Sequence, residues 1–100
     1  MAVIFHRSAL REYRRAIAEF GRNDVDLAVR FIQAVEDAVE RVDENPALGS
    51  PCFVAFRWVI VKKFKYVLYY RQVTESVSLI YAVAHPRRRP GYWLRRARRR

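Results

Sequence analysis

A histidine and several basic residues stand where an apolar segment of the chain stops. His85 follows the apolar residues 77–84 and precedes a proline, which has no amide hydrogen to donate and so ends the strand. Histidine titrates near pH 6.5 and can transfer a proton, while arginine and lysine can hold a phosphate. A ribonuclease that works without a metal needs these groups. The candidate catalytic residues are Lys63, Arg71, His85, Arg87 and Tyr92.

Each candidate also has a structural interpretation. His85 could end a strand and hydrogen-bond the residues after it, and Arg71 and Arg87 could be solvated or paired with a partner protein. Tyr92 and Trp93 could stack nucleic-acid bases, but the favoured interpretation is an anchor that packs the end of the chain onto the sheet.

Cysteine and histidine are too few and too scattered to indicate a metal site or a cofactor. Cys52 is the single cysteine, which excludes an internal disulfide and is typical of a reducing compartment. His6 and His85 have no metal-ligand spacing, and there is no glycine-rich phosphate loop. The apolar run before His6 is too short for a signal peptide, and no stretch approaches the roughly 20 residues of a membrane span. We therefore expect no cofactor, no membrane partner and a cytoplasmic location.

Charge is distributed unevenly along the chain. Residues 1–50 hold seven Lys and Arg against nine Asp and Glu, whereas residues 51–100 hold thirteen Lys and Arg against one acid, Glu75. So basic a half should attract phosphate or an acidic protein. We expect residues 95–100 to be a flexible tail beyond a single domain of residues 1–94. The candidates for contact with a partner or with nucleic acid are Arg57, Lys62, Lys65, Arg88, Arg89, Trp93, Arg95 and Arg96.

The first half of the chain predicts a short strand and a helix hairpin. Residues 2–6 form the strand, and Ser8 is the predicted N-cap of a first helix that stops at Gly21. Asn23 is the predicted N-cap of a second helix, which carries an apolar stripe and an acidic outer side and ends near Asp43. The short link between them makes the two helices antiparallel.

The second half predicts three strands, after a loop marked by Pro46, Gly49 and Pro51. The strands cover residues 57–64, 66–73 and 77–84, and the tight links between them indicate antiparallel pairs. The last strand is apolar on both faces, which favours a central position. The predicted fold class is α+β with the order β-α-α-β-β-β, in which the helix hairpin packs on one face of a small, mainly antiparallel twisted sheet.

Residues 64–71 (FKYVLYYR) and 82–93 (AVAHPRRRPGYW) resemble the RelE/ParE superfamily of bacterial toxins, which belong to type II toxin–antitoxin modules. Lys65 stands where the family usually has proline. The resemblance covers nearly the whole chain and implies a small basic toxin that an acidic antitoxin holds inactive in a hetero-oligomer.

The superfamily has two branches with different targets. RelE-like members cleave mRNA on the ribosome, and ParE-like members poison DNA gyrase. Trp58, Ile60 and Val67 stand where nuclease members have basic residues, which favours the ParE-like branch and leaves enzymatic activity open. The alternatives are a ribosome-dependent mRNA endonuclease and a non-toxic basic module that binds nucleic acid.

Overall fold

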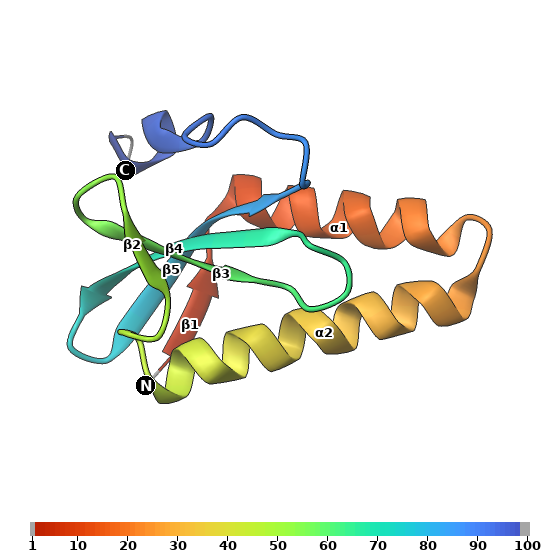
Figure 1. Cartoon of the computed structure of the whole chain (residues 1–100), viewed down its shortest axis with the longest axis horizontal. Coiled ribbons are helices and arrows are strands. Elements are labelled where there is room, and N and C mark those ends of the chain that lie inside the picture. The colour runs from red at the N-terminus through yellow and green to blue at the C-terminus, as the bar shows by residue number, and fades with distance from the viewer. Residues whose placement is uncertain (1, 99–100) are drawn as a thin grey trace.

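Two helices lie against one face of a five-stranded sheet, and the end of the chain crosses the other face (Figure 1). The computed structural model describes residues 2–98. The elements are β1 (Ala2–Phe5), α1 (Arg7–Gly21), α2 (Val25–Glu44), β2 (Ser50–Cys52), β3 (Phe56–Ile60), β4 (Val67–Thr74), β5 (Val77–Ala84) and a 3₁₀ helix, η1 (Leu94–Arg98). The predicted α+β class and element order are confirmed.

Each helix begins close to its predicted cap. The N-cap of α1 is His6 rather than Ser8, and the His6 ring accepts a hydrogen bond from the Ser8 N–H at 3.0 Å. The N-cap of α2 is Asp24 rather than Asn23, and its carboxylate accepts from the Leu27 N–H at 3.2 Å. Histidine is not a preferred cap, so the sequence signal favoured the serine two residues later.

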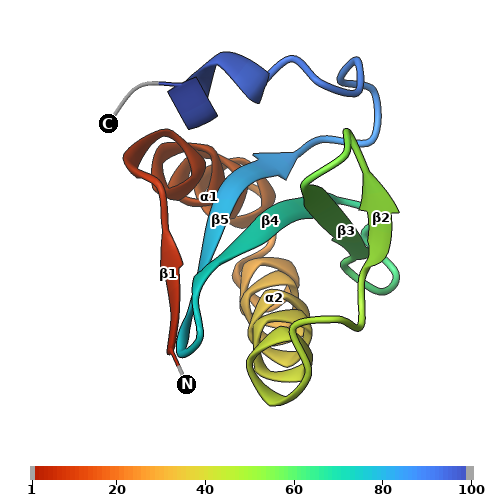
Figure 2. The same cartoon turned by 90° about the vertical axis from the view of Figure 1, so that its left-hand side faces the viewer.

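The strand order is β1-β5-β4-β3-β2. Strand β5 lies between β1, with which it is parallel, and β4, with which it is antiparallel. The predicted central position of β5 and both antiparallel hairpins are therefore confirmed. Figure 2 shows β1 and β2 at the two edges of the twisted sheet, with α2 seen nearly end-on beneath the strands.

The fifth strand, β2, was predicted to be a loop. Strand β2 has only three residues, one of them Pro51, and it pairs with the edge of β3. Proline is tolerated on such an edge, although its presence argued against a strand. The preceding Gly49 donates its N–H to the Tyr70 hydroxyl at 2.9 Å, and a Cβ at Gly49 would lie 2.7 Å from that oxygen. Close approach to Tyr70 therefore requires glycine here.

Two apolar clusters lie on opposite faces of the sheet. The larger cluster packs α1 and α2 against Val59, Val61, Leu68, Ile80 and Val83. The smaller cluster lies on the other face, where the C-terminal segment, residues 86–98, crosses the strands and buries Trp93. Residues alternate between the faces along a strand, so β3 sends Phe56 to the smaller cluster and Val59 to the larger one.

Candidate functional site

His85 lies immediately after β5, as predicted, at the end of the sheet where β4 begins. Val67, the first residue of β4, pairs with Ala84, the last residue of β5. The rings of His85 and Tyr66 make an edge-to-face contact, with their centroids 5.4 Å apart. The Nδ1 atom of His85 accepts a hydrogen bond from the Arg87 N–H at 3.0 Å, which closes the turn at Pro86. One nitrogen of this exposed ring is thus committed to local structure.

Arg71 lies toward the opposite end of β4, where it pairs with Leu79. Its guanidinium carbon lies 4.8 Å from the centroid of the Phe56 ring and 5.3 Å from that of Tyr81, and it donates a hydrogen bond to the Tyr81 hydroxyl at 2.8 Å. Four residues of strand separate this row from the Val67–Ala84 row, which is roughly 13 Å. Arg71 and His85 are therefore not brought together.

Lys63 lies in the turn between β3 and β4. The sequence predicts that it lies in a strand of residues 57–64, but β3 ends at Ile60. Lys63 and Lys65 have positive φ angles of 72° and 62°. The Lys65 N–H donates to the Val61 carbonyl at 2.9 Å, and the Val61 N–H donates to the Tyr66 carbonyl at 2.7 Å. A proline at position 65 fits neither that φ angle nor that hydrogen bond, so the departure from the usual family residue is accommodated by a different turn.

Several exposed basic side chains gather at this end of the sheet. The turn at Lys63 and the turn at His85 are joined by the Val67–Ala84 pairing and the Tyr66–His85 ring contact. We call this surface the basic end of the sheet; its residues are Lys62, Lys63, Lys65, His85, Arg87 and Arg89. Arg57 does not belong to it, because it is half-buried and its guanidinium donates to the Gly49 carbonyl at 2.7 Å.

The C-terminal segment is docked on the sheet through residue 98, whereas the sequence predicted a flexible tail from residue 95. Trp93 is completely buried, with its ring centroid 4.8 Å from that of Phe56 and 4.9 Å from that of Tyr69. The anchoring interpretation of Trp93 thus fits this packing, and a direct contact with a partner does not. Residues 99 and 100 of the predicted tail lie outside the described residues.

A carboxylate on α1, missed in the sequence, also holds the C-terminal segment. Glu12 accepts hydrogen bonds from the Tyr92 hydroxyl at 2.7 Å, from the Val83 N–H at 3.0 Å and from two Arg96 nitrogens at 2.9 and 3.0 Å. The run of arginines predicted a flexible tail, because nothing in the run indicates that Arg96 pairs with Glu12, 84 residues earlier.

The hydrogen bonds around Glu12 shift the pKa values of Glu12 and of Tyr92. Burial favours the neutral acid, but the hydrogen bonds from Arg96, Tyr92 and the Val83 N–H outweigh it and lower the pKa of Glu12 below 4.5. Burial, together with the hydrogen bond to Glu12, raises the pKa of Tyr92 well above its ordinary range. Tyr92 therefore stays protonated, and its hydroxyl has a structural role as a donor to Glu12.

Two large apolar side chains remain exposed on β3, on the face that the C-terminal segment partly covers. Trp58 is 37% exposed and Ile60 is 44% exposed. They share a face with Phe56, which Trp93 covers, but they lie further along the strand and are left open. This part of the sheet offers apolar contact rather than proton transfer.

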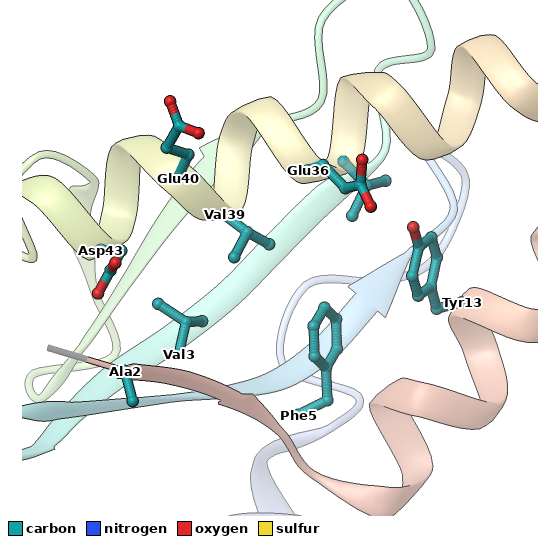
Figure 3. A pocket seen from close by; sticks show the side chains of 9 residues that line it. Ala2, Val3, Phe5, Tyr13, Glu36, Val39, Glu40 and Asp43 are labelled. Atoms are coloured by element: carbon teal, nitrogen blue, oxygen red, sulfur yellow. The ribbon is translucent and has the colours of Figure 1, made fainter.

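A second open surface, also missed in the sequence, lies between β1 and α2. It is a groove of about 570 Å³ with Val3, Phe5 and Val39 among its lining residues. Figure 3 shows the carboxylates of Glu36 and Glu40 along α2 above these apolar side chains. Such a groove is complementary to a segment that carries both apolar and cationic side chains.

Comparison with protein families matches residues 3–90 to the family described as ParE toxin of type II toxin-antitoxin system, parDE. The chain belongs to the ParE toxin family. This confirms the predicted RelE/ParE resemblance and its ParE-like branch. No curated protein matches the chain.

Membership of the ParE toxin family implies an antitoxin partner. The match ends at residue 90, so it includes β1 to β5 and His85 but not Tyr92, Trp93 or Arg96. The docking of the C-terminal segment through Glu12 thus involves residues beyond the matched region. Within residues 2–98, no helix is long and apolar enough to cross a membrane.

Proposed function

We propose that this ParE-family toxin stops bacterial growth by binding DNA gyrase through protein–protein contact, and that it acts in the cytoplasm. The observation that carries the proposal is the pair Trp58 and Ile60, which leaves an aromatic and an aliphatic side chain exposed on the sheet. Large apolar and aromatic residues supply most of the binding free energy at protein interfaces.

The separation of the candidate catalytic groups supports the same proposal. Cleavage of RNA without a metal needs a base, a phosphate ligand and an acid around one phosphate. Arg71 lies roughly 13 Å along the sheet from the Val67–Ala84 row, beyond which His85 follows, and Tyr92 is bound to Glu12 with a raised pKa. Arg71, His85 and Tyr92 each make hydrogen bonds within the protein that support its structure.

The cognate antitoxin is proposed to be acidic and to bind near the basic end of the sheet. Complementary charge steers two proteins together and increases the rate of association. The exposed Lys62, Lys63 and Lys65 lie within a few residues of Ile60, so an antitoxin seated there would also cover part of the apolar surface. One bound segment would then block access of gyrase.

Gyrase supercoiling by purified toxin tests the proposal. Wild-type toxin should inhibit, and the double variant Trp58→Ala, Ile60→Ala should need about 30-fold more protein or more, since a buried interface tryptophan contributes about 2 kcal/mol or more. The matched control is Val25→Ala, Val29→Ala, which removes two exposed apolar side chains from α2 and should inhibit like the wild type. Wild-type toxin that left supercoiling unchanged would contradict the proposal.

The alternative is ribosome-dependent cleavage of mRNA, which the basic end of the sheet with its exposed His85 favours. In that case, translating ribosomes with toxin yield cut mRNA, and His85→Ala abolishes both cleavage and toxicity. Under the gyrase proposal, His85→Ala keeps toxicity and translation continues after induction.

A further inference from the structure

A basic cavity lies between the start of α1 and the C-terminal segment. Its volume is about 350 Å³. The residues that line it come from the end of β1, the first turn of α1 and the C-terminal segment; they are His6, Ser8, Arg88, Tyr92, Arg95 and Arg96.

Positive charge around this cavity exceeds what the surrounding acids neutralise. Burial and then the charges of Arg96, Arg7 and Arg11 lower the pKa of His6 below 6.5, with Glu12 acting in the opposite sense. The Glu12 carboxylate is already engaged by Arg96, by the Tyr92 hydroxyl and by a backbone N–H. The cavity therefore has a net positive environment that an anion would stabilise.

Two of the arginines keep their hydrogen-bond donors for a ligand. Within residues 2–98, the guanidinium groups of Arg88 and Arg95 make no ion pair, while that of Arg96 is bound to Glu12 and to the Tyr81 carbonyl. The Arg88 guanidinium carbon lies 3.8 Å from the centroid of the Tyr92 ring. Stacking uses the face of a guanidinium and leaves the N–H groups at its edge available.

The position of Arg88 is fixed by a short chain of contacts. The Tyr92 ring lies against Arg88, its hydroxyl is bound to Glu12, and Arg96 lies 5.2 Å from the same ring. A preorganised guanidinium loses less conformational entropy when it binds a ligand. The planar fork of an arginine matches the oxygens of a phosphate, whose charge balances more than one guanidinium.

We propose that this cavity binds a phosphate group, supplied either by a free phosphate or nucleotide or by a nucleic-acid strand. Arg88 and Arg95 are the ligands, and Tyr92 and Arg96 hold Arg88 in place. The site goes beyond the proposed contact with gyrase and does not depend on it. Three of its residues, Tyr92, Arg95 and Arg96, lie past the matched family region.

Binding of short single-stranded DNA tests the proposal, measured by fluorescence anisotropy on the full chain. One strand carries a 5′-phosphate, a second lacks it, and inorganic phosphate is the competitor. The variant is Arg88→Gln, Arg95→Gln, whose two side chains are exposed. Loss of one charge-assisted hydrogen bond should weaken phosphate binding about tenfold or more.

The matched control is Arg15→Gln, Arg22→Gln, which removes the same charge from exposed positions further along α1 and just past its end. It should keep binding within about twofold, because loss of distant charge acts only through screened long-range attraction. Thermal unfolding of both variants at the wild-type temperature confirms that the fold is intact.

The pattern of binding identifies the source of the phosphate. Tighter binding of the 5′-phosphorylated strand, lost in the Arg88/Arg95 variant, supports the site with a terminal phosphate as its ligand. Equal binding of both strands, competed by inorganic phosphate and weakened in that variant alone, supports it with the strand's internal phosphates. Equal weakening in the variant and the control, or no binding of any phosphate probe, overturns the proposal.

Discussion

The carboxylate of Glu12 on the first helix forms an ion pair with the guanidinium of Arg96 at 2.9 Å, although 84 residues separate them. Both side chains are largely buried, at 20% and 18% exposure. The same carboxylate holds Tyr92 and the backbone of Val83. One acid therefore fixes the C-terminal segment to both α1 and β5.

Replacing Glu12 by glutamine should lower the free energy of unfolding by about 1–3 kcal/mol, because Arg96 is left half-buried without its counter-charge. Urea unfolding followed by circular dichroism measures this. Glu19→Gln is the control, since Glu19 is an exposed acid on the same helix, and it should change stability by no more than about 0.5 kcal/mol. Equal losses in both variants would show that the Glu12 pair contributes nothing specific.

Stability should also fall in acid because of Glu12. Its pKa is lower in the folded chain than its ordinary value of 4.5, so the folded state binds fewer protons. The stabilisation is complete above pH 4.5 and is lost as the pH falls through the folded-state pKa. Thermal unfolding in a pH series should show this loss in the wild type and a much smaller one in Glu12→Gln.

His6 contributes in a higher pH range. Its pKa lies below 6.5 in the folded chain, so its stabilisation is present above pH 6.5 and decreases as the pH falls toward the folded-state value. Because Glu12 raises the pKa of His6, the Glu12→Gln variant also changes the His6 contribution, and only the part of the difference between the two unfolding curves that falls below pH 4.5 is assigned to the carboxylate. A difference that did not depend on pH would contradict the Glu12 assignment.

The two tryptophans should differ sharply in their effect on stability. Trp93→Ala should cost about 3–5 kcal/mol, because a completely buried ring is lost between Phe56 and Tyr69. Trp58→Ala, at an exposed position, should cost about 1 kcal/mol. Denaturant unfolding of both variants measures the contrast, and equal costs would contradict the docking of the C-terminal segment.

Trp93→Phe separates the ring's packing from its polar atom. The Trp93 Nε1 is buried without a hydrogen-bond partner among the described residues. An unpaired buried donor costs about 1–3 kcal/mol, so its removal offsets part of the cavity left by the smaller ring. Trp93→Phe should therefore be much less destabilising than Trp93→Ala.

The bounds of a strand or helix could be predicted where neighbouring residues in the sequence determine them. Strand β5 occupies the predicted residues 77–84, because an apolar segment there is bounded by a turn and by Pro86. Strand β2 was missed because pairing with β3 stabilises three residues that include a proline. Strand β3 was predicted too long because the residues of the turn at Lys63 and Lys65 give no glycine or proline signal.

The sequence predicted a set of candidate residues, but it could not predict how they are arranged. His85 was placed correctly at a strand end, since proline punctuation is local. The distance between Arg71 and His85 depends on strand register, and the role of Tyr92 depends on Glu12, 80 residues earlier. Long-range pairing of this kind leaves no periodic trace in a single sequence.

The turn between β3 and β4 should reject the proline usual in the family. Lys65 has a φ of 62° and donates its N–H to the Val61 carbonyl, whereas proline requires a negative φ and has no N–H. Lys65→Pro should lower the free energy of unfolding by about 3 kcal/mol. Lys65→Gly should raise it by about 0.5–1 kcal/mol, because glycine adopts a positive φ without strain.

The neighbouring Lys62 provides the matched control for the turn. Its φ is not positive, so Lys62→Gly adds freedom to the unfolded chain and relieves no strain. Lys62→Gly should therefore lower the free energy of unfolding by about 0.5–1 kcal/mol, opposite in sign to Lys65→Gly. Urea unfolding of the three variants measures both signs. A stable Lys65→Pro variant, or the same sign for both glycines, would contradict the positive φ and the N–H hydrogen bond of Lys65.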